Sequence, residues 1–523
     1  MTEKRQFRAI KGTRDILPPD SALWNWFEQS ARSTFERYGF RDIRTPIFEE
    51  TELFARSIGV ETDVVGKEMY TFEDHDLPEL ESWRGKILMS QGFPGNLSPT
   101  SDYVREIRAF LDRVKSLSGA GEGKIPKTPE NIKAVENAAH FLDALANPAL
   151  TTGEVEVTLA QALSNVQNLA FGDVLSLRPE ATASVCRAYI EHGMHTLPGN
   201  VKLYYIGPMF RRERPQKGRY RQFYQIGAEV LGQSDAPAVD AEVIEMLLTF
   251  FRRVGLSKTT LYINSIGDKN CRPQYVELLR AELRKVKDKL KEDSQRRIDT
   301  NPLRVLDSKL PEEQPIIEQL PRIADHLCAE CRDHFAKLKE ELKLRNVAFE
   351  ENWRLVRGLD YYTRTTFEVI AAGLGSQNAV CGGGRYDGLA ELLGGPPTKG
   401  IGFAIGSDRC ILSIQETGSL PPLPGLTVFI AWMGAASYST AVGIARKLRD
   451  CGLSVELPPE EMKFKKSLAL ADKLGARYAL IIGEDEVASR TFTLKRLADA
   501  DQKKLTEQDL LEYLESEKRG TGA

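Results

Sequence analysis

The densest group of chemically useful side chains lies in residues 211–221. Five arginines and one lysine stand in this short stretch. Like charges at this density repel one another unless an anion is present, so the stretch predicts an anion-binding loop, with a solvated charged hairpin as the alternative. Two strand-like runs flank it, which indicates a hairpin. Polar Gln225 and Glu229 on the return run favour a cleft over a core.

Three further segments combine glycine with arginine. Residues 354–363 and 382–389 place arginine beside glycine and tyrosine. Glycine lets a backbone approach a ligand, and arginine offers a planar fork for phosphate or carboxylate, although each segment alone also fits a tight turn with a surface arginine. Residues 400–409 predict a strand and then a helix capped by Ser407 or Asp408. Arg409 in its first turn opposes the helix dipole and so indicates a counter-anion.

The elements that must position these residues follow from hydrophobic periodicity. Residues 20–38 predict a helix with an Asp20 cap and one buried face. Residues 41–48 predict a strand, and Pro46 within it indicates an edge or interface position. Residues 75–172 then interrupt the pattern with three predicted helices, near 102–117, 130–146 and 158–170, joined by linkers rich in glycine and proline. This stretch therefore predicts an inserted helical module.

The remaining chain divides into three parts. Strands and helices alternate over residues 174–250, the charged stretch 280–345 predicts helices, and strands return after Arg354. A proline-rich linker, residues 420–424, precedes the last part. Residues 426–516 predict an α/β domain of their own, with strands at 428–431, 454–457 and 478–482 and helices at 439–450 and 465–474.

Composition limits the class of protein. A chain of 523 residues predicts about three domains. No apolar run approaches the ~20 residues that span a bilayer, and residues 1–10 lack the layout of a secretory signal, so we expect a cytoplasmic protein without a membrane segment. Seven cysteines without a framework spacing favour reduced thiols. The net charge of -3 means that any surface for nucleic acid must be local.

Together these segments resemble the signature motifs of the histidyl-tRNA synthetases, a class II aminoacyl-tRNA synthetase family. The helix 20–38 with its Pro46 strand resembles motif 1, residues 210–229 resemble motif 2, and residues 400–409 resemble motif 3. Residues 357–362 and 382–386 resemble two motifs peculiar to the histidine enzyme, and residues 178–183 resemble its amino-acid-binding strand. The resemblance covers residues 1–74 and 173–523.

The resemblance implies an α+β fold, in which a catalytic core built on an antiparallel sheet carries helical insertions and is followed by a C-terminal α/β anticodon-binding domain. The implied parts are the core in three pieces (1–74, 173–280 and 351–419), a helical insertion of unknown role (75–172), a helical insertion domain near the tRNA (281–350), and the anticodon-binding domain (426–523). It also implies a hairpin between residues 69–74 and 174–177, which would hold the ends of the first insertion close together.

The implied activity is ligation of histidine to its tRNA. Histidine is first activated with ATP to histidyl-adenylate and pyrophosphate, and is then transferred to the 3′ end of tRNA(His). Both first reactants are anionic, so positive charge must be fixed along the line of displacement. The resemblance assigns this role to Arg211 and Arg357 as the catalytic residues. It implies an adenine held between Phe223 and Arg409, with Glu213 at its amino group, Arg219 at the γ-phosphate, and Mg²⁺ bridging the outer phosphates.

The histidine pocket follows from the same resemblance. Glu180, Thr182 and Gln225 would bind the α-amino group, Glu229 and Tyr362 the imidazole, and Tyr361 would close the pocket, while Arg211 and Arg357 would also contact the histidine. Such a polar pocket leaves buried groups unpaired when an analogue lacks their partners, so no editing domain is required. Ala181 stands where the family commonly has glycine, which is tolerable only if this residue does not need a positive φ.

The expected partners are L-histidine, ATP, tRNA(His) and a second copy of the chain, because motif 1 forms a two-fold interface in this class. Lys463, Lys465 and Lys466 lie in the domain that the resemblance assigns to the anticodon, although a solvated face is the alternative. Two other functions compete: a non-catalytic regulatory paralogue of histidine biosynthesis, which normally loses the arginines of motifs 2 and 3, and a nucleic-acid-binding protein on a decayed synthetase core.

One spacing suggests a metal. His326, Cys328, Cys331 and His334 form H-x-C-x2-C-x2-H. All four fall within one predicted helix, however, and cannot easily surround an ion tetrahedrally. We therefore expect no protein-bound metal site.

Overall fold

The computed structural model describes residues 7–59, 62–74, 77–89, 102–117, 129–147, 149–169, 171, 173–371, 378–417, 420–421 and 425–520. The chain forms two compact units, Met1–Leu420 and Pro421–Ala523. Each is described by itself below.

The first unit is built on an eight-stranded sheet of order β1-β5-β6-β11-β10-β9-β7-β8. Neighbouring strands run antiparallel, except for the outermost pairs β1/β5 and β7/β8, which are parallel. The strands are β1 (Arg41–Asp42), β5 (Val201–Phe210), β6 (Gln222–Gly232), β7 (Thr259–Ser265), β8 (Glu350–Glu351), β9 (Thr363–Ala371), β10 (Ala379–Arg385) and β11 (Lys399–Gly406). The predicted antiparallel core is confirmed.

The basic stretch lies at the tip of the β5–β6 hairpin, as predicted. The two strands pair from Val201↔Leu231 to Phe210↔Gln222, so residues 211–221 form the connection. The prediction of one strand over residues 41–48 is wrong. It is split into β1 and β2 (Phe48–Glu50), which belong to different sheets, with Pro46 between them. Since proline has no amide proton to donate, this is a natural place for the ladder to break.

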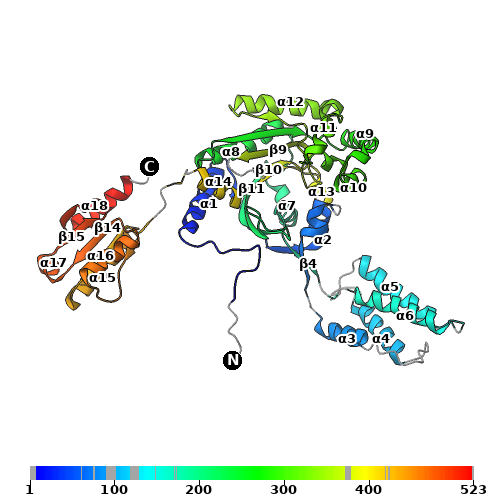
Figure 1. The fold of residues 1–523 in the computed structure, drawn as a ribbon, viewed down its shortest axis with the longest axis horizontal. Coiled ribbons are helices and arrows are strands. Elements are labelled where there is room, and N and C mark those ends of the chain that lie inside the picture. The colour runs from blue at the N-terminus through cyan, green and yellow to red at the C-terminus, as the bar shows by residue number, and fades with distance from the viewer. Residues whose placement is uncertain are drawn as a thin grey trace. The chain divides into compact units, whose positions relative to one another are not determined.

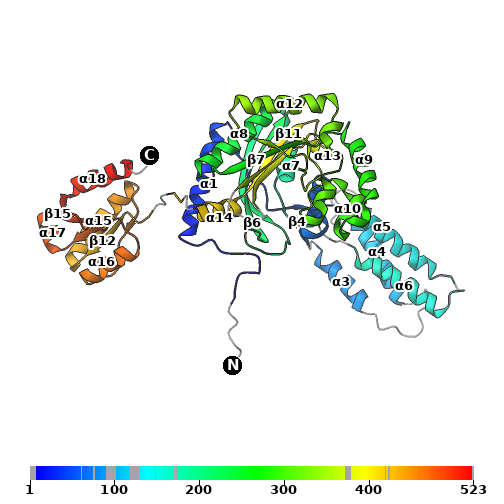
Figure 2. The same cartoon turned by 45° about the horizontal axis from the view of Figure 1, so that its top comes forward.

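Helices α1 (Asp20–Arg37), α8 (Pro237–Arg253), α12 (Ala329–Leu344) and α14 (Ser407–Thr417) pack on one face of this sheet (Figures 1 and 2). The α1 helix presents Phe27 and Phe35 to Phe250 of α8, with ring centroids 5.1 Å and 5.8 Å apart. This confirms the buried face predicted for residues 20–38. The predicted Asp20 cap is wrong, because Pro19 occupies the N-cap and Asp20 is the first helical residue, where its charge still favours the helix dipole.

A second, three-stranded antiparallel sheet has the order β2-β4-β3. Strand β3 (Tyr70–Glu73) pairs with β4 (Val174–Leu177) from Tyr70↔Leu177 to Glu73↔Val174. The amide of Asp74 extends this ladder by donating to the carbonyl of Asp173 at 2.9 Å. The predicted hairpin is thus confirmed. Around it lie α2 (Thr51–Ile58), the π-helical turn Val64–Glu68, α7 (Thr182–Glu191) and the 3-10 turn Met194–Thr196.

The segment between β3 and β4 contains four helices in its described residues, with a hydrophobic core of their own. They are α3 (Pro78–Met89), α4 (Asp102–Leu117), α5 (Pro129–Ala144) and α6 (Thr152–Gln167). The prediction found α4 and α5, missed α3, and began α6 six residues late, at 158 instead of Thr152, where Thr151 and Glu154 form a capping box. Ile132, an apolar residue of α5, is exposed.

The charged stretch is helical, as predicted, and α9 begins before it, at Arg272. Its helices are α9 (Arg272–Lys285), α10 (Glu292–Thr300), α11 (Gln314–Ile317) and α12, with 3-10 turns at Lys287–Lys289, Pro302–Val305, Pro311–Glu313 and Ile323–His326. The prediction of one helix through residues 326–334 is wrong. His326 ends a 3-10 turn, and α12 begins only at Ala329 with Cys328 as its N-cap. After β10, the short helix α13 (Leu389–Leu392) leads back towards β11.

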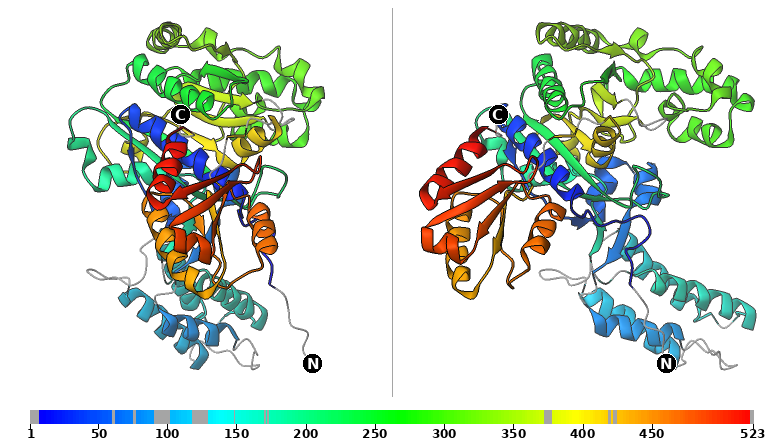
Figure 3. Two further views of the ribbon diagram at one scale, coloured as in Figure 1. Left: turned by 90° about the vertical axis from the view of Figure 1, so that its left-hand side faces the viewer. Right: turned by 60° about the vertical axis from the view of Figure 1, so that its left-hand side comes forward.

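The second unit is an α/β domain, as predicted. Its mixed sheet has the order β13-β12-β14-β15-β16, and Figure 3 shows it, coloured orange to red, with helices on both sides. Helices α15 and α18 pack on one face and α16 on the other. The elements are β12 (Val428–Trp432), α15 (Ala435–Asp450), β13 (Val455–Glu456), α16 (Phe464–Lys473), β14 (Tyr478–Ile482), α17 (Glu484–Ser489), β15 (Thr491–Arg496), β16 (Gln502–Thr506) and α18 (Glu507–Gly520).

Among the described residues of both units, no helix combines the length and the apolar character that a membrane crossing requires.

Candidate active site

An open cavity of about 1000 Å³ lies on the first unit, over the strands that carry the arginine- and glycine-rich segments. Residues from five separate parts of the sequence line it. It brings together these residues that the sequence singled out: Glu180, Thr182, Arg211, Glu213, Arg219, Phe223, Gln225, Arg357, Tyr361, Tyr362 and Arg409. Ala181 and Glu229 do not line it, because both are buried beneath its wall.

Arg211 stands just beyond the end of β5. Its Nε donates to the carbonyl of Pro179 at 3.0 Å, and its guanidinium lies over the ring of Phe223, 5.4 Å from the centroid. Glu213 is 3.9 Å from Arg211 and 3.2 Å from Arg219, so one carboxylate is flanked by two cations. This side of the cavity therefore holds excess positive charge beside an aromatic face.

Arg357 enters the cavity from the loop before β9. Its Nη1 lies 3.2 Å from Glu368 Oε1, and its guanidinium lies 5.7 Å from the ring centroid of Tyr362. The backbone of Gly382 lies directly against it, since a Cβ added to that glycine would be 2.1 Å from Arg357 Nη2. Glycine at this position of β10 is thus what gives the arginine its place.

Arg409 lies in the first turn of α14, as predicted, with its guanidinium donating to the carbonyls of Ala379 at 2.7 Å and Gly218 at 3.4 Å. Burial and the neighbouring Arg219 lower its pKa. The predicted cap is not at Ser407 or Asp408, because the helix begins at Ser407 and both are in its first turn. The Asp408 carboxylate accepts instead from the amide of Tyr224 at 2.9 Å and pairs with Arg14 at 2.8 Å.

The deepest part of the cavity is polar. The carboxylate of Glu180 accepts from the amides of Thr182 at 2.7 Å and Ala183 at 3.0 Å, and it faces the Tyr361 hydroxyl at 3.4 Å. Burial raises the pKa of Glu180, against the effect of these bonds. The side-chain oxygen of Gln225 is buried and accepts no hydrogen bond from the described residues. A buried acceptor of this kind suits a donor group such as an ammonium.

Glu229 lies behind this pocket, 1% exposed. It accepts from the hydroxyls of Thr182 at 2.8 Å and Tyr386 at 2.6 Å. Burial raises its pKa to about 8, even though the bonds from Tyr386 and Thr182 lower it. Gly402 on β11 leaves the space for this carboxylate, because a Cβ there would be 1.7 Å from Glu229 Oε2. In this structure Glu229 acts on the cavity through Thr182.

The backbone conformation at Ala181 decides whether alanine is tolerated there. Ala181 has φ of -117°, so alanine fits its backbone conformation without strain.

Arg385, in the glycine-rich segment 382–389, is neither on the surface nor in the cavity. Its guanidinium is fully buried in ion pairs with Asp240 and with Asp387, the latter at 2.9 Å. Its ion pair with Asp240 links the end of β10 to α8.

A second, wider cavity of about 1840 Å³ adjoins the first and shares Arg211, Glu213, Arg219, Arg357 and Glu368 with it. Its lining also includes Arg296, Arg297 and Arg304 from α10 and the turn after it, together with the carboxylates of Asp63, Glu68 and Asp307.

Sequence reasoning missed two residues that shape the site. Glu368 pairs with Arg357, and Tyr386 holds Glu229. Glu368 on β9 carried no signal beyond its charge. Tyr386 did carry one, because a tyrosine after a glycine-rich strand is well placed to donate a hydrogen bond into the sheet.

Comparison with known proteins agrees with this geometry. A family model described as histidyl-tRNA synthetase matches residues 147–409, and one described as anticodon binding domain matches residues 427–517. Two curated relatives, each named histidine--tRNA ligase, are 45% identical: one from Koribacter versatilis, covering 97% of this chain and 96% of its own length, and one from Solibacter usitatus, covering 97% and 99%. The crystal structure of apo histidyl-tRNA synthetase from S. aureus superposes with a TM-score of 0.67 at 30% identity, covering 98% of this chain and 100% of its own.

An antiparallel sheet that carries an arginine hairpin, a strand-to-helix arginine and a separate C-terminal α/β unit defines a class II aminoacyl-tRNA synthetase. Within that class, the chain belongs to the histidyl-tRNA synthetase family.

Proposed function

We propose that this chain is a histidine–tRNA ligase, which activates L-histidine with ATP and transfers it to tRNA(His). The observation that carries the proposal is the meeting of Arg211 and Arg357 with a buried polar pocket in one cavity. The two anionic reactants, an amino acid and ATP, can therefore be bound side by side.

In the first step, a carboxylate oxygen of histidine attacks the α-phosphorus of ATP. The bond from that phosphorus to the bridging oxygen of the β-phosphate breaks, and pyrophosphate leaves with the electron pair. Negative charge on the α-phosphoryl oxygens must be stabilised as this occurs. Arg211 and Arg357 both line the cavity, and each is oriented by a partner of its own, the carbonyl of Pro179 and the carboxylate of Glu368. We assign the catalytic role to these two arginines.

ATP binds between the aromatic and basic side chains of the hairpin and of α14. Phe223 and Arg409 would enclose the adenine, Glu213 would accept from its amino group, and Arg219 would bind the γ-phosphate, because all four line the cavity. Mg²⁺, which neutralises charge on the outer phosphates, prefers oxygen ligands. Glu368 offers carboxylate oxygens beside Arg357 and fits that preference.

Histidine selection rests on the polar pocket. Glu180, Thr182 and Gln225 would bind the α-amino group, and Tyr362 the imidazole, with Tyr361 as the wall. Glu229 would contribute through the Thr182 hydroxyl that donates to it. A site built from such groups rejects analogues that leave them unpaired by about 10⁴ to 10⁵. No second, editing site is needed.

In the second step, a ribose hydroxyl at the 3′ end of the tRNA attacks the histidyl carbonyl, and AMP leaves. The adjoining cavity supports a route for this end, because it shares Arg357 with the first and is lined by Arg296, Arg297 and Arg304. The helical segment 281–350 then lies near the tRNA. Lys463, Lys465 and Lys466 at the start of α16 are candidates for phosphate contacts in the C-terminal unit.

We also propose a homodimer. Phe48, Phe72 and Val174 are exposed on the small sheet, Ile47 is exposed directly before it, and the rings of Phe48 and Phe72 lie 6.4 Å apart. Adjacent exposed apolar residues of this kind mark an interaction surface. This surface adjoins the motif 1 segment. We also propose the cytoplasm as the compartment, because seven cysteines without a framework spacing favour reduced thiols.

The deciding experiment is histidine-dependent exchange of pyrophosphate into ATP, followed by charging of tRNA(His). Activity in both assays, absent with other amino acids, is the expected result. A chain that binds tRNA or histidine without exchange would instead be a regulatory paralogue or a binding protein on the same fold, and the proposal would fail.

A further inference from the structure

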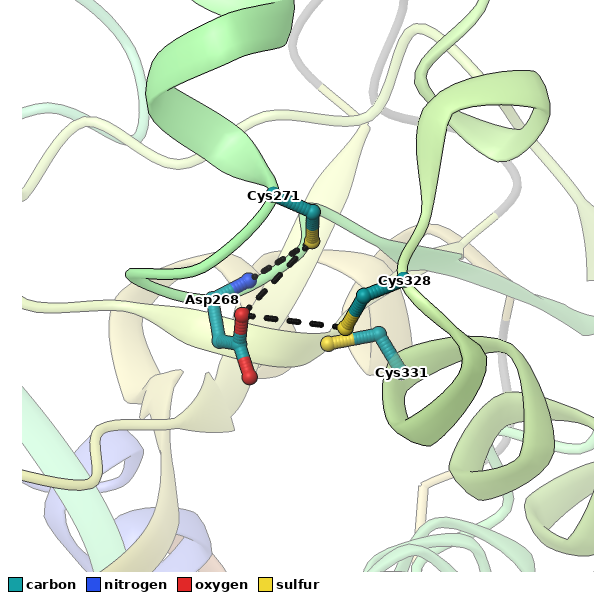
Figure 4. A group of neighbouring side chains, drawn as sticks. All are labelled: Asp268, Cys271, Cys328 and Cys331. Carbon is teal, nitrogen blue, oxygen red and sulfur yellow. Dashed lines mark hydrogen bonds between the residues drawn. The ribbon is translucent and has the colours of Figure 1, made fainter.

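Outside the two cavities, three cysteines and one aspartate meet where two helices begin. Asp268 and Cys271 come just before α9, and Cys328 and Cys331 stand at the start of α12 (Figure 4). Their ligand-type atoms all lie within 4.8 Å of one another. All four side chains are at least half-buried, and Cys331 is fully buried.

The spacing is that of a structural zinc site. Both pairs have two residues between the ligands, as in many zinc-binding motifs. Tetrahedral zinc, with Zn–S of about 2.3 Å and Zn–O of about 2.0 Å, holds its ligand atoms about 3.5 to 3.8 Å apart. Asp268 Oδ1 lies 3.6 Å from Cys271 Sγ and 4.0 Å from Cys328 Sγ. We propose that these four residues bind one zinc ion.

The backbone is shaped around the first pair. The amide of Asp268 points at Cys271 Sγ, 3.5 Å away, and that of Asn270 donates to Asp268 Oδ1 at 2.9 Å. Gly267 has φ of 67°, and a Cβ there would lie 2.8 Å from Cys271 Sγ. The turn thus depends on glycine to bring the sulfur inward. An amide directed at sulfur stabilises the thiolate that a metal requires, and one directed at a carboxylate oxygen orients that ligand.

Both helices favour negative charge at this point. Cys271 is the N-cap of α9, and Cys328 is the N-cap of α12. The N-terminal end of a helix carries partial positive charge, which lowers the cost of forming a thiolate there. The two halves of the cluster are therefore matched in spacing and in electrostatics.

A basic residue stands beside the cluster. Three thiolates and a carboxylate around a divalent ion leave a net negative charge, and Arg364 Nη2 lies 3.5 Å from Asp268 Oδ2. The amide of Arg364 donates to the carbonyl of Gly267 at 2.7 Å, which ties β9 to the turn. An outer residue that both orients a ligand and balances the charge is typical of metal sites.

The histidines of the H-x-C-x2-C-x2-H spacing face elsewhere. His334 Nε2 lies 3.0 Å from the carbonyl oxygen of Asp235, and the ring of His326 packs near that of Tyr275. Cys328 precedes α12 instead of lying inside it, so the four residues of this spacing do not share one helix. The two cysteines of that spacing are completed by residues sixty positions earlier.

The zinc ion would hold the starts of α9 and α12 in place next to the histidine pocket. Arg272, the first residue of α9, donates from its guanidinium to the carbonyl of Tyr362. The ion would connect α9, α12 and, through Arg364, the start of β9. Its loss should loosen Tyr361 and Tyr362 and raise the KM for histidine more than that for ATP.

The test uses the full chain, purified under reducing conditions and loaded with zinc, or with cobalt as a spectroscopic probe. We expect about one zinc per chain by elemental analysis. Cobalt should give a thiolate-to-metal charge-transfer band and strong tetrahedral d–d absorption. Cys328→Ser and Asp268→Asn should lose metal at equal chelator concentration. Cys451→Ser, which alters a half-buried thiol of the C-terminal unit, is the matched control and should retain it.

Asp268→Cys should keep the metal and strengthen the charge-transfer band, because it adds a thiolate. If the Ser and Asn variants do not fold, the wild-type cobalt spectrum and Asp268→Cys still decide the matter. A zinc-loaded chain without stoichiometric metal, a cobalt spectrum without the thiolate band, or a Cys328–Cys331 disulfide in the freshly purified protein would each overturn the proposal.

Discussion

Arg357 shows how a single cation is fixed where charge develops. Its contacts with Glu368, Tyr362 and the backbone at Gly382 hold the guanidinium before any substrate binds. Orientation of this kind matters for catalysis because the protein does not have to reorganise during the reaction.

Removal of this cation should therefore act mainly on the rate. We expect Arg357→His to reduce adenylate formation by about 10² to 10³, with a much smaller effect on histidine binding. Gly382→Ala should resemble it, since the new methyl group would occupy the position of the guanidinium. Pyrophosphate exchange measures the first quantity and calorimetry the second. Gly443→Ala, where an added Cβ meets nothing within 4 Å, is the control. Near-normal exchange in Arg357→His would refute the assignment.

Glu229 makes the stability of the fold depend on pH. Its pKa in the folded chain is raised to about 8 by burial, above an unfolded value of about 4.3. The folded state therefore binds the proton more tightly. The stabilisation is complete below about pH 4 and is lost as the pH rises towards about 8.

Glu229→Gln cannot ionise, so it should lack this dependence. We expect the wild type to lose up to a few kcal/mol of unfolding free energy relative to the variant between pH ~5 and ~8, since one pKa unit corresponds to about 1.4 kcal/mol. Urea titrations at several pH values measure this difference. Parallel curves for the two proteins would mean that Glu229 is charged in the fold. Above about pH 8, where the wild-type carboxylate is ionised, the variant should also bind histidine more weakly, with ATP binding unchanged, because only the wild type then offers an anionic acceptor.

The β3–β4 hairpin explains how a long insertion is accommodated. Its ends leave the ladder side by side at Glu73 and Val174, and the helices between them have a separate core. Closure of a longer loop costs only about 0.6 kcal/mol per doubling of its length.

We therefore predict that residues 75–172 neither activate nor edit. Replacement of this stretch by a short turn containing glycine should leave adenylate formation within about twofold. A selective loss of tRNA charging would indicate that the insertion contacts tRNA. Loss of adenylate formation in a folded dimer would contradict the prediction.

Local patterns predicted most helices, the β5–β6 hairpin and the alternation of the C-terminal unit, because hydrophobic periodicity is written in neighbouring residues. Elements that depend on partners distant in the sequence were harder to predict. The break between β1 and β2 arises because each strand joins a different sheet, and α3 has too weak an apolar stripe to be recognised without its neighbours.

The same distinction, between local patterns and contacts between distant segments, holds for the residues of the candidate site. Motif arginines could be named because their density is unusual. The pairing of Glu368 with Arg357, and the approach of Asp268 to Cys328, could not, because each joins segments that only the folded sheet brings together. Arg385 was misjudged for this reason too, since its partner Asp240 lies on α8.

For the whole molecule, the exposed residues of the small sheet predict self-association. Phe48→Asp should convert a dimer into a monomer at micromolar concentration and reduce aminoacylation strongly, because a charge cannot be buried cheaply in an apolar contact. Light scattering measures the mass. Leu344→Asp, at the exposed end of α12, is the control and should remain dimeric. A wild-type chain that is monomeric and fully active would contradict the predicted self-association.

The position of β11 affects how the chain can fold during synthesis. This strand lies between β6 and β10, yet it is the last of the eight to leave the ribosome. Until residue 406 emerges, β6 and β10 each expose an edge that will be interior in the finished sheet. Unpaired edges favour aggregation, and domains usually fold as they appear. The two central pairings of the sheet, β6 with β11 and β10 with β11, can therefore form only after nearly the whole first unit has been synthesised.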